Sequence, residues 1–475
     1  MDTLESIPSH TTAAEDAIRA PEPVAASAPW RPLTRLGFRI AFIYFIGFIL
    51  LYGNGSIFIN GFIFGSWITN LIKWPIDHVA IWSGRHIFHL ANVPANWHVT
   101  HVGDRMINWV LDRIAIAGAL IGGLAWTGIA WLRGSRRTEY NTLLAWLRFL
   151  LRLSVGFFMI GYGMVKVFPL QMAPISVAVL NQPAGQMTPE ILLWSAIGLY
   201  PLYQSICGMA EVFAGSLVLF RRTALAGALM SVFLMSNVVL YNLFFGVSVK
   251  LFAINLLLAA VFIVLPDLKP LLNFFWRHEP AVQTGIWTPP ATSRGLRLYI
   301  RALEVIFIAA LFTIDPLVDS AMWYHRRVVA RIESPLLGGW QVDSTHPATG
   351  AFITPTGPAT ELYVDTVERG MRRSQDGTLW YAILTVNSAA HTLLIKPFFD
   401  RPPVSYDWRM PDVNHLILTA ETPKGATPDS KATQNAKPRP VLHPDVVTLT
   451  RIPLPTHYRL LDRSFHFVSH GATER

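Results

Sequence analysis

The residues whose types could do chemistry are ionisable and amide side chains inside long apolar segments. They are Arg152, Lys166, Glu211, Asn237, Asn242 and Lys250. A charged side chain at the centre of a membrane helix costs about 2.5–3.5 kcal/mol, so each one needs a partner or a function. Lysine would supply a cation and hydrogen-bond donors, asparagine would supply hydrogen bonds, and glutamate would carry a proton. This set predicts a polar pocket for an anionic or quinone-like head group.

The depth of these side chains follows from the helical rise of 1.5 Å per residue. Lys166, Asn242 and Lys250 lie at one level near the ends of three apolar segments. Glu211 lies about ten residues, or roughly 15 Å, from Arg221 in the opposite loop, and is therefore deeper. We expect the four to converge in the core of a helix bundle. No acid directly precedes Lys250, so repulsion between the two lysines favours an anionic occupant.

The alternatives to a pocket need no ligand. Lys166 and Lys250 could extend their ammonium groups to the lipid–water interface, as lysines near helix ends do. Glu211 is too deep for that, and it would instead be protonated or paired with Arg152. Under these alternatives the lysines and the glutamate need not face one another.

A second group of candidates lies between the first two apolar segments. It consists of His86, His89, His98 and His101, with Asp104 close by. Two His-x-x-His pairs place each pair on one helical face, a spacing that can ligate a metal ion. No acid or cysteine has a fixed spacing to them, so we expect no metal site. The alternatives are hydrogen bonding over the helix mouth by His86, His89 and Asp104, or an interfacial helix with ordinary histidines, which nearby tryptophans favour.

The elements that must position these residues are membrane-spanning helices. Of the 475 residues, 52% are hydrophobic and 15% are charged, against about 25% charged in soluble domains. A bilayer requires about 20 apolar residues per helix. Seven segments approach that length, namely 38–59, 112–132, 147–168, 197–219, 223–245, 247–266 and 298–317.

The positions of lysine and arginine predict the orientation in the membrane. Their excess, 39 against 30 acids, is typical of cytoplasmic loops and does not indicate a nucleic-acid partner. Alternate loops carry arginines, such as Arg136 and Arg221, whereas residues 169–190 contain no Lys or Arg. We expect a bacterial inner-membrane protein with a cytoplasmic N-terminus and an extracytoplasmic C-terminal domain. Residues 1–35 lack the apolar core of a signal peptide and are expected to form a disordered cytoplasmic tail.

The C-terminal residues 334–475 have a different pattern. Short runs with alternating apolar and polar residues, such as 379–386, predict antiparallel strands. A closed barrel is favoured because closure leaves no exposed strand edge. Gly339-Trp340 resembles the start of lipocalin-like barrels, in which Arg463 or Arg475 would lie over the tryptophan. We expect a packed interior more than a ligand-binding one.

Several motifs carry a family resemblance. They are Tyr162-Gly-Met-Val-Lys-Val-Phe168, Glu211-Val-Phe-Ala-Gly215, Arg221-Arg222-Thr223, Val249-Lys250-Leu251 and Leu265-Pro-Asp-Leu268, joined by Arg85-His-Ile-Phe-His-Leu90 and the closing segment 463–475. The chain resembles the DoxX family of four-helix membrane proteins, and more narrowly the long bacterial DoxX-like proteins with a C-terminal β-domain. The resemblance implies a link to oxidoreductases, some members being associated with quinone-coupled sulfur oxidation.

The expected fold is an all-α polytopic membrane protein of about seven helices, with a DoxX-like four-helix core and a lipocalin-like antiparallel β-barrel. Its parts are the tail (1–35), a transmembrane pair with a long outer loop (36–135), the DoxX-like unit (146–272), a seventh helix (298–318) and the barrel (334–475).

The expected function is a quinone- or lipid-binding subunit that supports a membrane redox reaction. Its partners would be the lipid bilayer and a quinone or an oxidoreductase. The alternative is a non-catalytic transporter or scaffold whose barrel binds a partner or lipid. No catalytic residue is singled out, and an enzymatic role would be that of a membrane oxidoreductase subunit.

Overall fold

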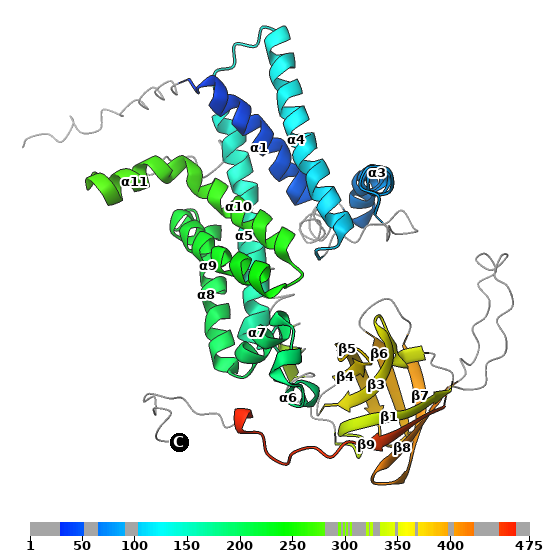
Figure 1. Ribbon diagram of the computed structural model, residues 1–475. Coiled ribbons are helices and arrows are strands. Elements are labelled where there is room, and N and C mark those ends of the chain that lie inside the picture. The colour runs from blue at the N-terminus through cyan, green and yellow to red at the C-terminus, as the bar shows by residue number, and fades with distance from the viewer. Residues whose placement is uncertain are drawn as a thin grey trace, which may run out of the picture.

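A computed structural model describes residues 29–51, 65–90, 103–280, 333–346, 350–365, 369–397, 403–421 and 446–461, with short pieces between 293 and 325. Helices form one part of the chain and a β-barrel forms the other (Figure 1). Six described helices are long and apolar enough to cross a membrane, which confirms the first six expected spans, although residues 52–59 of the first lie outside the described residues. The seventh, 298–317, lies almost entirely outside the described residues.

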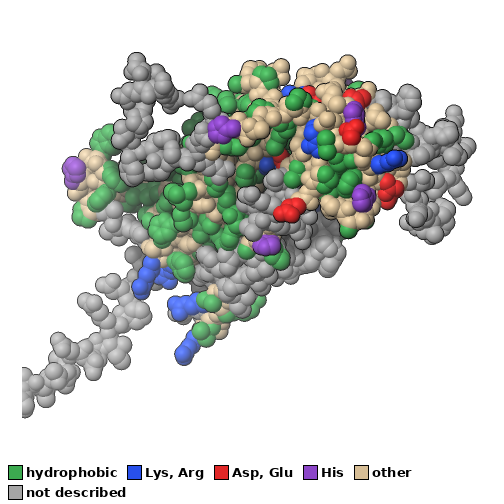
Figure 2. Space-filling model, turned by 90° about the horizontal axis from the view of Figure 1, so that it is seen from below, with side chains coloured by type: hydrophobic (Ala, Val, Ile, Leu, Met, Phe, Trp, Pro, Cys, Tyr) green, Lys and Arg blue, Asp and Glu red, His purple; other side chains and the backbone are tan. Residues whose placement is uncertain are grey.

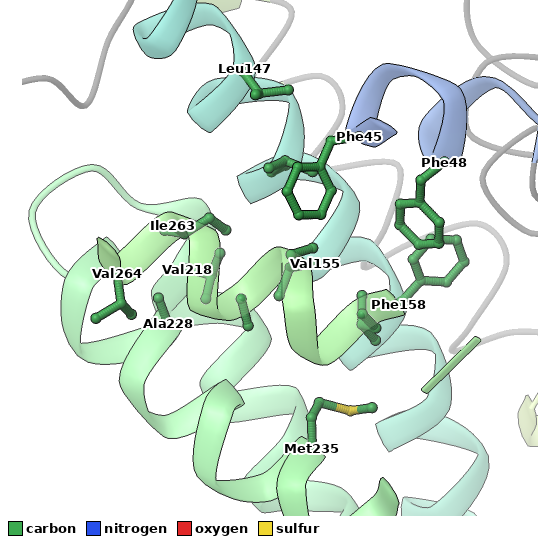
Figure 3. Close-up of a cluster of buried hydrophobic side chains, with 14 of the residues drawn as sticks. Phe45, Phe48, Leu147, Val155, Phe158, Val218, Ala228, Met235, Ile263 and Val264 are labelled. Atoms are coloured by element: carbon green, nitrogen blue, oxygen red, sulfur yellow. The ribbon is translucent and has the colours of Figure 1, made fainter. Parts of the chain in front are cut away.

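The six helices pack in pairs, and one of them, α5, is central. They are α1 (Pro32–Leu51), α4 (Met106–Leu132), α5 (Asn141–Val167), α8 (Pro201–Leu219), α9 (Ala224–Phe245) and α10 (Lys250–Val264). Helix α1 packs along α4, α5 along α8, and α9 along α10. Helix α5, which is about 40 Å long, is the most buried of the six. Its side chains meet those of α1, α8, α9 and α10 in one apolar core, which includes Phe45, Phe158 and Met235 (Figure 3).

Glycines allow α5 and α8 to approach closely. A Cβ atom added at Gly163 would lie 2.8 Å from the carbonyl oxygen of Gly208, and one added at Gly208 would lie 2.5 Å from that of Gly163. Gly156 and Gly215 oppose each other in the same way further along the two helices. Small residues let membrane helices pack backbone against backbone. Gly163 and Gly215, which belong to two of the sequence motifs named above, therefore lie at a helix crossing.

The N-terminal helix begins earlier than the sequence predicts. Helix α1 starts at Pro32, inside the stretch 1–35 that was expected to be a disordered tail. Proline suits the first position of a helix because it lacks the N–H that has no partner there. The ring of Trp30 packs edge-on against Phe38, and the backbone N–H of Trp30 donates to the carbonyl oxygen of Thr138 at 3.0 Å. These contacts order residues 30–35, while residues 1–28 lie outside the described range.

Shorter helices flank the bundle. Helix α3 (Gly65–His86) is viewed nearly end-on in Figure 1, so it lies across the direction of α4. The link between α5 and α8 contains α6 (Val177–Leu180) and α7 (Pro189–Gly198). Helix α11 (Leu268–Arg277) follows α10 and exposes Phe275 and Trp276 on one face. An exposed apolar face of this kind is typical of a helix at a membrane surface.

The C-terminal region is a closed eight-stranded antiparallel barrel, as the sequence predicts. Its strands are β1 (Gly338–His346), β3 (Gly357–Val364), β4 (Gly370–Ser374), β5 (Leu379–Asn387), β6 (Thr392–Pro397), β7 (Val404–Asp412), β8 (His415–Ala420) and β9 (Val446–Arg451). Each strand from β3 to β9 pairs with the next, β9 pairs with β1, and β1 closes the barrel against β3. The two-residue strand β2 (Ile353–Thr354) pairs with β3 alone. This up-and-down order is the one found in lipocalins.

The barrel interior is packed with apolar side chains. Trp340, Leu384 and Tyr406 are fully buried within one core cluster. An arginine does cover Trp340, but it is Arg451, whose guanidinium carbon lies 4.2 Å from the ring centroid. Arg451 ends β9 and so lies beside β1, whereas 463 and 475 fall outside the described residues. The sequence did not single out Arg451, because the end of the last strand cannot be located from composition.

Candidate functional site

A cavity lies among α5, α8, α9 and α10. Its polar lining residues are Lys166, Gln171, Glu211 and Asn242. The remaining lining is apolar and aromatic: Phe158, Met159, Tyr162, Met235, Val238, Tyr241, Val249, Phe252, Ala253 and Leu256. The structure thus brings together three of the four side chains that were expected to converge. The fourth, Lys250, does not line the cavity.

Lys166 and Glu211 form a buried ion pair. The ammonium of Lys166 donates to Oε1 of Glu211, and both side chains are 7% exposed. The pair bridges α5 and α8. Lys166 lies three residues after Gly163 on α5, and Glu211 lies three residues after Gly208 on α8. Lys166 therefore does not extend to the lipid–water interface, and the partner of Glu211 is not Arg152.

Several polar atoms at the cavity have no partner among the described residues. Oε2 of Glu211, Oε1 of Gln171 and both amide atoms of Asn242 are buried and make no hydrogen bond to any described residue. Asn242 is fully buried. Each unsatisfied buried group costs about 1–3 kcal/mol. A molecule that donates to the oxygens and accepts from the amide nitrogen would remove these costs.

Gln171 is a site residue that the sequence did not indicate. It lies in the link after α5, where no periodic pattern marks a side chain as facing inward. The next residue, Met172, is held at both backbone atoms by the amide of Gln204: its N–H donates to Oε1 at 3.0 Å, and its carbonyl accepts from Nε2 at 2.8 Å. These two hydrogen bonds hold the start of the link against the N-terminal turn of α8, on the side of the bundle where the cavity lies.

Lys250 has an acidic partner, contrary to expectation. The carboxylate of Asp104 accepts the backbone N–H of Lys250 at 2.7 Å and that of Leu251 at 3.1 Å, and it lies 3.5 Å from the Lys250 ammonium. Asp104 thereby caps the N-terminus of α10, where negative charge is favourable. Because each lysine has its own carboxylate, the repulsion that favoured an anionic occupant is absent.

Two buried arginines serve the fold. Arg152 donates to the carbonyl oxygens of Val218 at 3.0 Å and Leu219 at 2.5 Å, and so caps the C-terminus of α8. Arg148, which the sequence did not single out, forms a buried ion pair with Asp267 at 2.7 Å. Asn237 is exposed on α9 and does not line the cavity.

The histidine candidates are not assembled into a site within the described residues. His86 is exposed, with Nδ1 2.9 Å from the carbonyl oxygen of Trp82 and its ring stacked on that indole. His89 is also exposed. Across the described ranges, no three His, Cys, Asp or Glu side chains lie close enough to hold a metal ion. His98 and His101 lie outside those ranges.

The barrel is attached to the link between α5 and α8. Asp365 accepts the N–H of Val177 at 3.0 Å, and Arg369 donates to the carbonyl oxygen of Pro174 at 2.6 Å. Asp365 and Arg369 also pair with each other at 3.1 Å. The link that carries Gln171 is therefore the one that holds the barrel, which places the barrel at the cavity end of the bundle.

Comparison with known proteins adds little about function. The chain is similar to the "Uncharacterized protein YwoB" of Bacillus subtilis (strain 168), at 29% identity over 138 residues. The match covers 27% of this chain and 81% of that protein. No family model matches the chain, and no solved structure does.

Proposed function

We propose that the chain is a DoxX-like quinone-binding membrane subunit, and that a quinone head group occupies the cavity among α5, α8, α9 and α10. The observation that carries this proposal is the set of unpaired buried atoms on Glu211, Gln171 and Asn242 inside an otherwise apolar and aromatic lining. The amide nitrogen of Asn242 would donate to a quinone oxygen. A hydroxyl of the reduced ring would donate to Oε2 of Glu211.

The cavity has a volume of about 40 Å³, which is room for one or two water molecules and is below the 300–1,000 Å³ typical of ligand pockets. We therefore propose that only one oxygen-bearing edge of the quinone ring enters the cavity, with the rest of the ring outside it. Tyr162, Tyr241 and Phe252 would pack against a flat ring, and the isoprenoid tail would lie in lipid. The proposal assigns binding and proton acceptance to this chain, and electron transfer to an oxidoreductase partner.

Asn242→Leu tests the quinone site. Leucine has a similar size but removes both unpaired amide atoms, so we expect quinone copurification to fall to background. The free energy of unfolding should stay the same or rise by about 1–3 kcal/mol, because two buried unsatisfied groups are removed. Mass spectrometry of material purified in mild detergent measures the quinone, and thermal unfolding measures the stability.

Asn237→Leu is the matched control for this substitution. It places the same change on the same helix, but at an exposed position outside the cavity. We expect the Asn237→Leu protein to retain its quinone. If the Asn242→Leu protein carries as much quinone as wild type, the site is elsewhere.

A scaffold without a redox role is the second candidate. It is favoured by the packed interior of the barrel, which leaves its outer surface as the part that would meet a partner. Hydrophobic side chains cover much of the helical part, whereas acidic side chains gather toward the barrel (Figure 2). Wild-type protein that copurifies with a second protein and with no quinone would favour this candidate.

The orientation is proposed from charge and from the attachment of the barrel. Helix α5 runs from the arginine-rich loop at 133–137 to the link that holds the barrel, and positive loops face the cytoplasm. The barrel would then be extracytoplasmic, and the chain between α11 and β1 would have to cross the membrane. We expect alkaline phosphatase fused after Arg475 to be active and a fluorescent protein fused there to stay dark. The opposite pair of results would place the barrel in the cytoplasm.

A further inference from the structure

Helix α11 has a polar face and an apolar face. Its polar residues follow one another at intervals of four, so with about 3.6 residues per turn they share one side of the helix. They are Lys269, Asn273 and Arg277. The apolar face on the opposite side consists of Leu268, Leu272 and Phe275. Phe275 is 68% exposed, and Trp276, which lies between the two faces, is 83% exposed.

The direction of α11 is held by a buried ion pair at the bend that precedes it. A short 3₁₀ turn, Leu265–Asp267, separates α10 from α11. Arg148 on α5 donates to the carbonyl oxygen of Ile263 at 2.8 Å and to the carboxylate of Asp267 at 2.7 Å, and both charged side chains are buried. Leu271, on the inner side of α11, packs against the apolar core of the bundle. These contacts hold α11 where it turns away from α10 (Figure 1).

The end of the bundle that carries α11 is rich in basic residues. Helices α9 and α10 pack along each other and are joined by residues 246–249 alone, so α9 starts at the end of the bundle where α10 stops. Arg221 and Arg222, which precede α9, are exposed at this end. Lys269 and Arg277 on α11 are exposed as well. Since these loops mark where the spans end, α11 lies at the level of the lipid head groups.

The charges at this end favour an anionic surface. Glu279, just after α11, accepts a hydrogen bond from the side-chain amide of Asn273 at 2.9 Å and contributes one negative charge. The basic side chains outnumber it. Each lysine or arginine near an anionic membrane strengthens binding about fivefold, without having to touch a particular phosphate. An exposed apolar face beside a basic one is the pattern of helices that lie in the plane of the membrane surface.

We propose that α11 lies in the head-group layer of the membrane and binds anionic phospholipids there. Leu272 and Phe275 insert among the acyl chains, and Trp276 lies at the boundary with water, where tryptophan is enriched. Lys269 and Arg277 face the lipid phosphates. This surface is at the opposite end of α10 from the proposed quinone cavity, and neither proposal depends on the other.

Spin labels on the two faces of α11 test its position in the membrane. Cys207 is the one cysteine of the chain, so Cys207→Ala gives a background for Phe275→Cys or Asn273→Cys. In full-length protein in nanodiscs, we expect oxygen, which concentrates in lipid, to relax the label at 275. A water-soluble nickel chelate should relax the label at 273 instead.

Three results of the labelling would overturn the membrane position. Relaxation of both labels by the chelate means that α11 stands in water. Relaxation of both by oxygen alone means that α11 continues the span of α10. A label at 275 that neither reagent reaches means that protein covers the apolar face, either a second copy or a partner.

The preference for anionic lipid is tested with Lys269→Gln/Arg277→Gln. We expect phosphatidylglycerol nanodiscs to raise the unfolding temperature of the wild type above its value in phosphatidylcholine, and the double variant to lose about half of that rise. High salt should reduce the rise, because it screens exposed charges. Lys396→Gln/Arg409→Gln is the matched control, since it removes two exposed basic residues from the barrel strands β6 and β7.

The control variant should show the full wild-type rise in phosphatidylglycerol. Equal unfolding temperatures of all three proteins in phosphatidylcholine show that each is folded. The lipid preference is refuted if the two lipids give the same unfolding temperature for the wild type, or if the α11 variant keeps the whole rise.

Discussion

Lys166→Met is expected to lower the free energy of unfolding by about 3–5 kcal/mol, because it leaves the buried carboxylate of Glu211 without its cation. Thermal or denaturant unfolding in detergent measures the loss, and quinone copurification should fall as well.

The double variant Lys166→Met/Glu211→Leu separates stability from binding. Removing both charges of a buried pair is often neutral, so most of the lost stability should return. The quinone should not return, because Oε2 of Glu211 is gone. A single variant as stable as wild type would mean that the two side chains are not paired in the membrane.

The membrane helices and the barrel could be predicted because local patterns determine them. Apolar length alone marks α5, α8, α9 and α10, and alternation alone marks strands such as β5. The ends of elements are less local: just before α1, Trp30 contacts Thr138 and Tyr140, which precede α5 and lie more than 100 residues away in the sequence. Similarly, which arginine covers Trp340 depends on where β9 stops.

The site could be predicted only in part, because partners are chosen by tertiary packing. Depth along the helices placed Lys166 and Asn242 at one level with Glu211 deeper, and packing in a bundle predicted that these side chains converge. Depth does not say which way a side chain points around its helix, so the pairing of Lys166 with Glu211 could not be derived. The acid for Lys250 is Asp104, which lies 146 residues away in the sequence, and no local pattern connects the two.

Gly163→Ala is expected to force α5 and α8 apart. The added methyl group would lie 2.8 Å from the carbonyl oxygen of Gly208 and 2.9 Å from the backbone nitrogen of Val212. Backbone atoms in a packed helix cannot move aside as a flexible side chain can, so overpacking should cost about 1–3 kcal/mol. Lys166 is three residues further along α5, and a wider helix separation would also weaken its contact with Glu211.

Gly161→Ala gives the matched control on the same helix. A Cβ atom at Gly161 meets nothing within 4 Å, and alanine favours a helix over glycine by about 1 kcal/mol. We therefore expect the Gly161→Ala protein to unfold at the wild-type temperature or above it and to keep its quinone. The Gly163→Ala protein should unfold at a lower temperature and lose quinone, although neither glycine is among the residues that line the cavity. Equal behaviour of the two alanine variants would show that the close crossing of α5 and α8 does not hold the site together, since the two differ only in whether the new methyl group meets α8.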